Sequence, residues 1–427
     1  MQRSASASRS SFAATLLLGV LAAAVVASVI VFPDRAFQAS LQGLTVWWKL
    51  VFPALLPFLI LSELLVGFGV IHAFGTLLDP LMRRLFGISG FGGWALASGL
   101  VIGFPTGAKI TADLREKQLL SRQEAERLAA LSHVCSPIFL VGVVGAGFLH
   151  SARLGLALAA VHYAAALLAG VLLRRRAPAA AQGAAAGARP EADGGPLVRQ
   201  ALRAMRAAYV CDGRAFGKLL GDAVASAVQT LMLIGGYMMI FAVLAHVAAT
   251  VRLAAALGFV GNALARLLGA AGPIEASAWV QSALDVHLGS YALSQAGGLP
   301  VAGQLALLGA ALGWGGLAAH AQVAGLLHRT DARYAPFLLA RCLHAGLAFA
   351  LTLLLARPLA PLWRAAAPSL APLPAAGSAA AGRTADAALA AAQAASAAGW
   401  PLALALVTGA LLLASLALHR RRGRNAR

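Results

Sequence analysis

Long apolar runs, separated by short basic stretches, dominate this chain of 427 residues. A helix needs roughly 20 apolar residues to cross a bilayer. By that measure we count eight spans, at residues 12–32, 44–71, 128–148, 154–173, 223–247, 305–327, 337–355 and 400–418. The pattern therefore predicts an all-α polytopic membrane protein.

Two more apolar segments, at 91–108 and 277–293, contain breaks that a plain spanning helix does not have. The breaks are Gly103-Phe-Pro-Thr-Gly-Ala-Lys109 and Asp285-Val-His-Leu-Gly-Ser290. Backbone that leaves the helix at membrane depth is tolerated only where it is buried in protein or lines a wet cavity. We expect re-entrant hairpins here, although the pattern alone also allows both segments to span.

Other signals refine the expected helices. Pro53 and Pro57 each remove a backbone donor and should bend or break the second span, and Gly235-Gly236 stands at the corresponding place later in the chain. Further breaks are expected at Ser136-Pro137 and at Gly313-Trp-Gly-Gly316. Interfacial helices are predicted at 71–87 and 251–271, and one charged helix at 109–127.

The same order of segments occurs twice, which predicts two repeats. Each repeat has three crossings by this count, and an odd number joined by a linker on one side makes the second repeat inverted relative to the first. The predicted units are an N-terminal transmembrane helix (1–40), a first repeat (41–176), a cytoplasmic basic linker (177–217), a second repeat (218–360), a low-complexity loop (361–398), and a C-terminal transmembrane helix with a basic tail (399–427).

Composition agrees with a membrane location. The chain is 60% hydrophobic and only 11% charged, whereas a soluble domain carries about 25% charged residues. The formal net charge of +19 resides mainly in loops between apolar runs, where cytoplasmic retention of Lys and Arg explains it. The Arg174-Arg175-Arg176 triplet and the basic C-terminus mark the inner side. We therefore expect a multi-pass protein of the cell membrane and no nucleic-acid partner.

The chain shows none of the motifs of a soluble enzyme. It has no Walker loop, GxSxG or HExxH motif, and its three cysteines have no metal-ligand spacing. We predict no enzymatic activity, no catalytic residues, no cofactor and no metal site. The lack of a nucleotide-binding motif also argues against an ATP-driven pump.

The breaks instead predict a substrate site. The helix that starts in Gly103–Lys109 presents free N–H groups and about half a positive charge, and Lys109 adds a full charge, so the site suits a carboxylate or phosphate. The candidate substrate-binding residues are Gly103, Pro105, Thr106, Gly107, Lys109, Ser136, Asp285, His287, Gly289, His320 and Gln322.

Each of these assignments has a structural alternative. Lys109 would merely mark the cytoplasmic end of the hairpin and meet lipid headgroups, and Ser136 would only satisfy a proline kink. A histidine such as His287 would be held by structural hydrogen bonds. Arg341 lies inside a predicted span and must face the protein interior or snorkel to the inner surface, and snorkelling is favoured because it costs less.

Several of these motifs together resemble the YlbJ-type sporulation integral membrane proteins, which contain two copies of the Gate, or nucleoside recognition, domain. The resemblance covers residues 40–357 and rests on Trp47-Trp48, Pro53, Pro57, Ser62-Glu63-Leu64, Gly103–Lys109, Ser136-Pro137, Gly315-Gly316, His320-Ala-Gln322, Thr330-Asp331 and Tyr334. It implies a fold similar to concentrative nucleoside transporters, with hairpins and broken helices meeting at a central site.

The resemblance also implies a function in endospore formation. The family is linked to movement of dipicolinic acid, a small planar dicarboxylate, from mother cell to forespore, which would place the protein in the outer forespore membrane. The alternatives are a nucleoside-type carrier and a non-transporting scaffold for spore-envelope assembly. The expected partners are the small-molecule anion, the lipid bilayer and, in a homo-oligomer, further copies of the chain.

Overall fold

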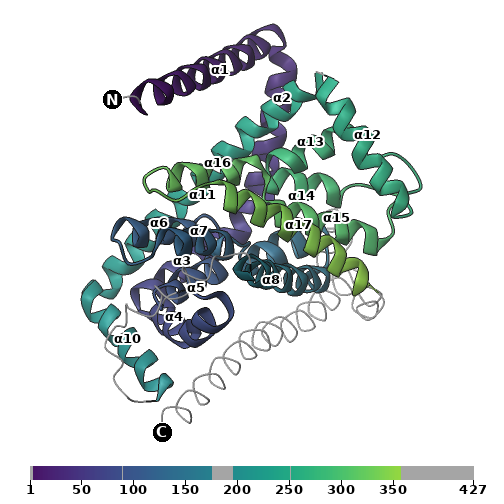
Figure 1. Cartoon of the computed structure of the whole chain (residues 1–427). Helices are drawn as coiled ribbons and strands as arrows, with labels where there is room; N and C mark the ends of the chain where they lie inside the picture. The colour runs from purple at the N-terminus through teal and green to yellow at the C-terminus, as the bar shows by residue number, and fades with distance from the viewer. Residues whose placement is uncertain (1–2, 89, 176–195, 251, 357–427) are drawn as a thin grey trace, which may run out of the picture.

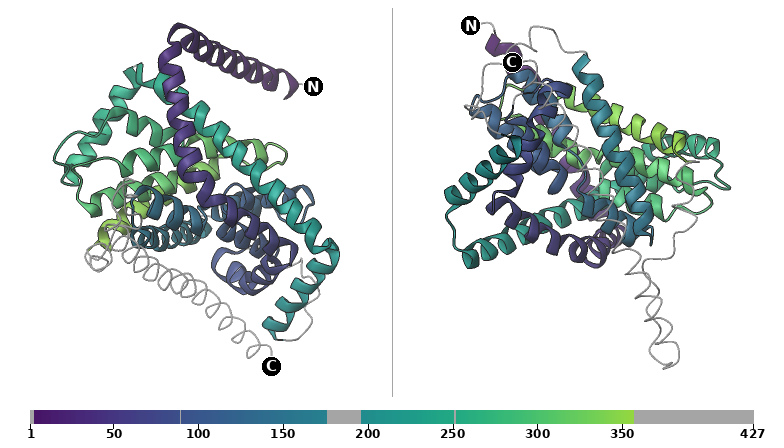
Figure 2. Two further views of the ribbon diagram at one scale, coloured as in Figure 1. Left: turned by 180° about the vertical axis from the view of Figure 1, so that it is seen from behind. Right: turned by 90° about the horizontal axis from the view of Figure 1, so that it is seen from below.

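The computed structural model describes residues 3–88, 90–175, 196–250 and 252–356, and every regular element in these ranges is a helix (Figure 1). The all-α prediction is therefore confirmed. The first helix, α1 (Arg3–Val31), extends away from the other helices and meets α2 at a bend around Phe32 and Pro33 (Figures 1 and 2).

Five helical segments among the described residues are long and apolar enough to cross a membrane. They are Pro33–Gly67, Ala152–Arg174, Phe216–Ala248, Val301–Leu327 and Ala335–Leu354, and each overlaps a predicted span. The run at 12–32 contributes only the shorter apolar stretch Ala22–Val31, and the run at 128–148 is divided by a break. The run at 400–418 lies outside the described residues, as do the predicted loop 361–398 and tail. The count of eight spans remains a prediction.

The proline-rich second span is bent and not broken. It consists of α2 (Pro33–Val46), a π-helical turn η1 (Trp47–Val51) and α3 (Phe52–Gly67), which follow one another without a gap. In the π turn the Phe52 N–H bonds to the Trp47 carbonyl, five residues back. Such a wider turn is a known way to absorb a kink in a helix, and it lies directly before Pro53.

Its counterpart, α11 (Phe216–Thr250), continues through Gly235-Gly236 without a break. Gly235 makes room: a Cβ on this residue would lie 2.6 Å from the Trp47 ring, and the indole Nε1 of Trp47 donates to the Leu231 carbonyl at 2.9 Å. The two long helices pack against each other and run side by side in Figure 2. Gly235 is thus a helix–helix contact, whereas a Cβ on Gly236 would have nothing within 4 Å.

The two segments predicted as interfacial are helical, as α4 (Val70–Leu81) with the π turn η2 (Met82–Phe86), and as α12 (Arg252–Leu267). Their location at the membrane surface stays a prediction. The prediction of a single charged helix at 109–127 is wrong. The segment is divided into α6 (Thr106–Glu116) and α7 (Arg122–Ser132). The reason is a capping box: the Ser121 side chain accepts from the Glu124 N–H, and the Glu124 carboxylate accepts from the Ser121 N–H.

The order of elements in 33–175 recurs in 216–354. In each half a pair of short helices is followed by a helix with a break and then by a long helix. In the first half these are α5 (Gly92–Val101) with α6, α7 with the π-helical η3 (Phe139–Phe148), and α8 (Ala152–Arg175). In the second half they are α13 (Ala276–Leu284) with α14 (Val286–Ser294), α15 (Val301–Trp314) with α16 (Gly316–Leu327), and α17 (Ala335–Leu354).

Contacts between the halves are reciprocal. The second short helix of each half packs on the segment after the break in the other half, as α6 on α16 and α14 on η3, and the long helices α8 and α17 pack together. One apolar core, with Phe139 and Leu140 from one half and Leu231 and Leu308 from the other, joins them. This arrangement brings all four breaks to the middle of the molecule. That the halves are inverted repeats in the membrane stays a prediction.

Candidate functional site

The first break lies between α5 and α6, at Ile102 to Pro105. Gly103 has φ +93°, a conformation that only glycine adopts readily, and a Cβ there would lie 2.9 Å from the Ser136 N atom. α6 then starts at Thr106 without a side-chain cap. The N-terminus of α6 therefore has no side-chain cap, although the Thr106 N–H donates to the Gly103 carbonyl at 3.2 Å. An anion site at Gly103–Lys109 stays a prediction.

The hairpin formed by α5 and α6 fits tightly on the end of α7. A Cβ on Gly99 would lie 2.0 Å from the Ser132 carbonyl oxygen, and a Cβ on Gly107 would lie 2.3 Å from the same atom. Two glycines, one from each short helix, thus make contact with one carbonyl. Glycine is required at both positions because the backbones are in contact.

The second break is an unwound segment, His133 to Ser136, between α7 and η3. Side chains of other helices hold its backbone. The Cys135 N–H donates to Nε2 of His162 at 3.1 Å, and the hydroxyl of Tyr163 donates to the Cys135 carbonyl at 2.9 Å. Because Nε2 of His162 accepts a hydrogen bond there, its ring is the neutral tautomer with the hydrogen on Nδ1. Neighbouring residues of α8 thereby hold the two peptide groups on either side of the Cys135 Cα.

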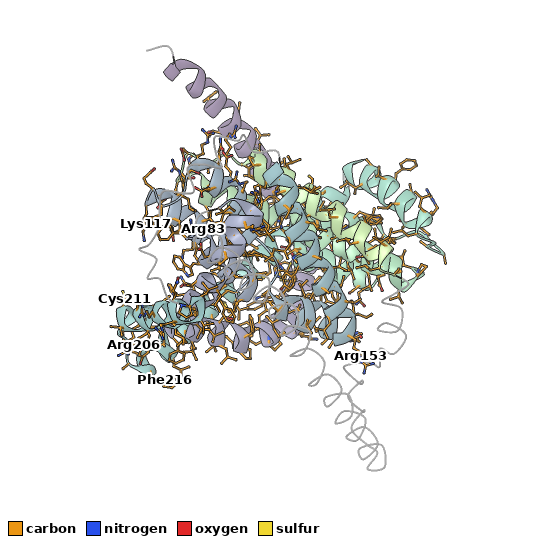
Figure 3. The ribbon with its side chains drawn as sticks, turned by 60° about the horizontal axis from the view of Figure 1, so that its bottom comes forward. Arg83, Lys117, Arg153, Arg206, Cys211 and Phe216 are labelled. Atoms are coloured by element: carbon orange, nitrogen blue, oxygen red, sulfur yellow. The ribbon has the colours of Figure 1, made fainter. Side chains whose placement is uncertain are left out.

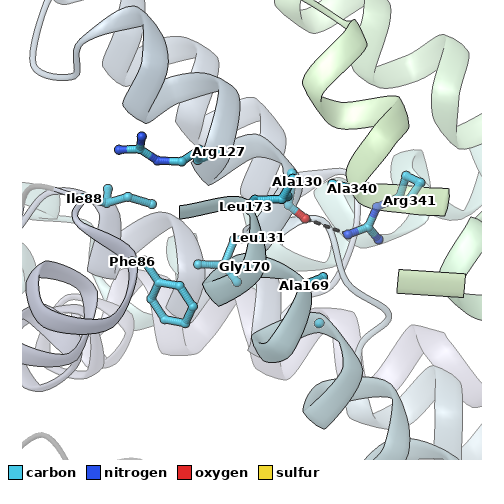
Figure 4. A pocket seen from close by; sticks show the side chains of 11 residues that line it. Phe86, Ile88, Arg127, Ala130, Leu131, Ala169, Gly170, Leu173, Ala340 and Arg341 are labelled. Carbon is cyan, nitrogen blue, oxygen red and sulfur yellow. Dashed lines mark hydrogen bonds between the residues drawn. The ribbon is translucent and has the colours of Figure 1, made fainter. Parts of the chain in front are cut away.

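Arg341 on α17 completes this support, and the prediction that it snorkels is wrong. Its side chain is buried, and its guanidinium donates to the Ala130 carbonyl (Figure 4) and to the His133 carbonyl, both at 2.7 Å. These are carbonyls that the end of α7 leaves without helical partners. The guanidinium also lies 5.5 Å from the Phe337 ring centroid. A fixed positive charge therefore stands directly behind the unwound segment.

A narrow pocket lies on the other side of Arg341, between α7, α8 and α17 (Figure 4). Arg127 and Arg341 contribute its charged groups, and Ala166, Ala169 and Gly170 of α8 contribute part of its apolar wall. Arg127 donates to the Gly87 carbonyl at 3.0 Å. Both guanidinium groups thus donate to backbone carbonyls. The pocket is mainly a space left by small side chains.

The third break is a single residue, Asp285, and this corrects the predicted break at Asp285–Ser290. Val286 to Ser290 are helical, and the Asp285 carboxylate caps α14 by accepting from the N–H groups of His287 and Leu288, each at 2.9 Å. Gly289 allows α14 to fold back on α13, since a Cβ there would lie 2.3 Å from the Ser282 Cα. Asp285 therefore neutralises the N-terminus of its helix by itself.

The fourth break, at Gly315 and Gly316, is as predicted. Both glycines have positive φ, +86° and +77°, and a Cβ on Gly316 would lie 2.7 Å from the Asp285 Cα. His320 follows on α16. Its Nδ1 is 2.6 Å from the Tyr334 hydroxyl, and its Nε2 is 3.1 Å from the Trp314 carbonyl. That carbonyl can only accept, so Nε2 carries the hydrogen and Nδ1 accepts from Tyr334.

Aromatic rings join the four breaks into one cluster. Phe104 lies between His133 and His287, with ring centroids 5.3 and 6.1 Å away. His287 also packs on Phe139 at 4.9 Å, and Phe337 contacts both His133 and His320. We call this group, Phe104, His133, Phe139, His287, His320 and Phe337, the aromatic cluster. It contains residues from both halves.

Two buried histidines of this cluster have ring nitrogens without a hydrogen-bond partner. They are Nδ1 and Nε2 of His133 and Nδ1 of His287; the latter faces the Asp285 carboxylate at 3.5 Å. His133 is 2% exposed and His287 5%. Unpaired buried polar atoms cost free energy, and those in native proteins call for an explanation. A ligand carboxylate would accept from the N–H of such an imidazole, whereas the second nitrogen of a neutral ring is itself an acceptor and needs a donor.

The predicted residues divide into two groups. Gly103, Gly107, Ser136, Asp285, His287, Gly289 and His320 are buried at or beside the breaks, with Pro105 and Thr106 half-buried next to them. Lys109 is exposed on α6, and Gln322 is half-buried on α16, two residues after His320 and so on another side of the helix. No contact places either of these two in the aromatic cluster, and their role as substrate ligands stays a prediction.

Sequence reasoning missed His133, Phe104, His162 and His344. His133 precedes Cys135-Ser136-Pro137, and Phe104 lies inside the predicted motif, so proximity to a break was the available signal. His162 and His344 had no such signal. They lie on α8 and α17, with ring centroids 4.4 Å apart, and Nε2 of His344 donates to the His162 carbonyl at 2.9 Å. Only the packing of the two long helices reveals them.

Ion pairs outside the apolar runs fasten the loop before α17 to α6 and α7. Arg115 makes a bidentate pair with Asp331, at 2.8 and 2.9 Å, and the hydrogen bonds from Arg115 lower the pKa of Asp331. Burial would raise the pKa of Glu126, but hydrogen bonds from Arg333 and Arg122 hold it below its ordinary value. The Arg115–Asp331 and Arg333–Glu126 pairs thus join the two halves. They hold the loop that leads to Tyr334 and to Phe337 of the aromatic cluster.

Replacement of Asp285 tests its capping function. Asp285→Ala should lower the free energy of unfolding by about 1–2 kcal/mol, the usual cost of losing an N-cap side chain. Asp285→Asn should keep most of that stability, because an amide oxygen can accept the same two N–H bonds. Thermal unfolding of the purified protein in detergent measures both. Equal losses in the two variants would show that the charge, and not the cap, is what matters.

Comparison with known proteins identifies the class. A family model described as nucleoside recognition, the Gate domain, matches residues 48–149, the part of the chain that holds the first two breaks. The fold and this match define a multi-pass membrane protein with a Gate domain. The match lies within the first half of the chain, and a second Gate domain in residues 218–360 stays a prediction.

A full-length relative identifies the family. The sporulation integral membrane protein YlbJ of Bacillus subtilis (strain 168) is 38% identical over 349 residues, which are 82% of this chain and 84% of YlbJ. The chain therefore belongs to the YlbJ family of sporulation integral membrane proteins. No solved structure matches it. Membership and the Gate domain together support a role in membrane transport or in sporulation.

Proposed function

We propose that this protein is a transporter, and not an enzyme, that carries a small organic anion across a membrane of the sporulating cell. The substrate that fits best is dipicolinic acid, moved from mother cell to forespore. The observation that carries the proposal is the aromatic cluster, where unpaired buried nitrogens of His133 and His287 stand beside Phe104 and Phe139, at the breaks of both halves.

The charges near this cluster favour an anion. Arg341 adds a buried positive charge behind His133, whereas the carboxylate of Asp285 is already engaged by N–H groups of α14. The uncapped N-terminus of α6 adds a further partial positive charge. A carboxylate bound there would exchange its water for N–H donors, which is the usual way a buried anion is stabilised.

The rings favour a planar substrate. Phe104, Phe139 and Phe337 surround the histidines, and aromatic rings prefer offset-stacked or edge-to-face partners. Dipicolinic acid has one aromatic ring and two carboxylates. Its ring would pack on the phenylalanine rings, and its carboxylates would accept from the N–H donors. Movement of one half against the other around a fixed central site would then expose it to each side in turn.

A nucleoside is the second candidate, favoured by the description of the matching Gate domain. Ribose hydroxyls need acceptors, and the sequence offers Asp285, Gln322 and Glu63 for this purpose. In the structure Asp285 caps α14, and Glu63 accepts from the Ser226 hydroxyl at 3.0 Å. Two of the three acceptors are therefore occupied, which favours the anion. The scaffold alternative depends on 177–198 and 420–427, which lie largely outside the described residues.

The test uses a strain that lacks this protein. We expect its spores to contain little dipicolinate while synthesis in the mother cell is intact, and the wild-type gene to restore the content. His133→Phe and His287→Leu should fail to restore it at normal protein level, because they remove the unpaired donors while keeping the side-chain volume close to the original. Normal dipicolinate in the deletion strain would refute this substrate.

Purified protein in vesicles separates the transport alternatives. Dipicolinate uptake above that of empty vesicles, with no uptake of uridine, is the expected result. Uridine uptake alone would identify a nucleoside carrier. Uptake of neither, together with a normal spore phenotype in the histidine variants, would favour the scaffold.

A further inference from the structure

The helix that follows the interrupted linker has three distinct faces. This helix, α10 (Leu197–Asp212), packs on α4 with Leu197 and Ala201 buried. At about 3.6 residues per turn, the next face carries Val198, Leu202 and Tyr209, which are 51%, 54% and 50% exposed. Beyond it lies a third face with Arg199, Arg203 and Arg206, all exposed, and with Val210, which lies among them and is 68% exposed. An apolar stripe thus separates the packed face from a basic stripe.

The position of α10 explains why an apolar stripe is uncovered there. Gly69, at the end of the long span Pro33–Gly67, fits against the backbone of Met205, where a Cβ would lie 2.2 Å from its carbonyl. Phe68 lies 6.2 Å from the Tyr209 ring and stacks on Phe216, the first residue of α11, at 6.4 Å. α10 therefore lies at the level where one spanning helix ends and another begins.

Figure 3 shows that α10 lies near the start of α11, with Arg206 and Cys211 of α10 and Phe216 of α11 at one corner of the molecule. Trp and Tyr are enriched where spanning helices leave the hydrocarbon, and Tyr209, in contact with Phe68, has such a position. The Arg174-Arg175-Arg176 triplet precedes the linker to α10, which puts this end of the molecule on the inner side of the membrane.

We propose that α10 lies in the cytoplasmic membrane surface and binds the phosphate groups of anionic phospholipids. Its apolar stripe enters the boundary between headgroups and acyl chains, and its three arginines contact phosphates at the rim. A helix with these two adjacent stripes has the composition of an interfacial helix. The linker between the two halves is thereby fastened to the lipid surface at its second end, directly before α11.

The proposal is tested on the full-length protein in vesicles of phosphatidylcholine with increasing phosphatidylglycerol. An environment-sensitive fluorophore is attached at Leu202→Cys or, as the matched control, at Ala207→Cys, which is exposed on the opposite side of the exposed arc. The background carries Cys211→Ser and Cys342→Ser, because both cysteines are exposed. Quenching by lipids with a nitroxide at the headgroup reports contact with the membrane surface.

We expect strong quenching at position 202 and weak quenching at 207, with quenching at 202 increasing as phosphatidylglycerol is added. Each basic residue near an anionic surface contributes about 5-fold to the preference for it. The R199Q/R203Q/R206Q variant should therefore lose this dependence, while R329Q, which removes an exposed arginine elsewhere, keeps it.

Two further outcomes decide the identity of the ligand. Inorganic phosphate should not displace the label at 202, and displacement at millimolar concentration would show a site for free phosphate. Equal quenching at 202 and 207, or quenching at 202 that ignores both phosphatidylglycerol and the three arginines, would overturn the proposal. These results do not depend on which substrate the protein carries.

Discussion

Arg341→Leu is expected to unfold the site and to abolish transport. The guanidinium is the donor for the carbonyls of His133 and Ala130, and a buried carbonyl left without a donor costs about 1–3 kcal/mol. Loss of a buried charge offsets part of this cost. We expect the free energy of unfolding to fall by about 2–4 kcal/mol, measured by thermal or denaturant unfolding in detergent.

Arg341→Lys refines this result. An ammonium group cannot reach two carbonyls in the planar arrangement that the guanidinium uses, so the lysine variant should be intermediate in stability and still weak in dipicolinate uptake. Arg329→Leu, at an exposed arginine in the loop before α17, is the control and should behave as wild type. A stable and fully active Arg341→Leu protein would show that the unwound segment does not need this support.

Gly107→Ala is expected to have the second-largest effect, although alanine is the better helix former. In an open helical position this change stabilises by about 1 kcal/mol. At Gly107 the added Cβ would lie 2.3 Å from the Ser132 carbonyl oxygen, so the hairpin of α5 and α6 must move away from the unwound segment. Overpacking of this kind costs about 1–3 kcal/mol, and uptake should be lost because the cluster is pulled apart.

The matched control is Gly325→Ala on α16, where a Cβ would have nothing within 4 Å. It should raise the unfolding temperature slightly and leave uptake unchanged. The two substitutions are chemically identical and both lie in helices, so only the close approach of backbones distinguishes them. Wild-type uptake in Gly107→Ala would show that the contact between hairpin and α7 is not needed for function.

The cause of each break decided how well it could be predicted. Gly103, Pro105, Pro137 and Gly315-Gly316 are intrinsically poor in helices, so their effect is local and visible in the sequence. Gly235-Gly236 is equally poor by propensity, yet α11 continues through it because the Trp47 ring packs there. The same residue type thus marks a break in one place and a helix contact in another, according to what lies beside it.

The sequence by itself determined the features that depend on local chemistry. Long apolar runs had to form helices in a membrane, because an unpaired backbone group in hydrocarbon costs several kcal/mol. The breaks at Gly103–Pro105, Pro137 and Gly315-Gly316 followed in the same way, whereas the extent of the break at Asp285 and the continuity of α11 through Gly235-Gly236 did not. The motifs also sufficed for the family, since the chain is 38% identical to YlbJ over 349 residues.

Only the tertiary structure decided which groups meet at the site. His133, His162 and Arg341 are far apart in sequence, and each could have been an ordinary core or snorkelling residue. The packing of α8 on α17 and of both on α7 places Arg341 against the carbonyls of the unwound segment and His162 against its N–H. These partners are fixed by the crossing of helices, a long-range property that hydrophobic periodicity and residue preference do not contain.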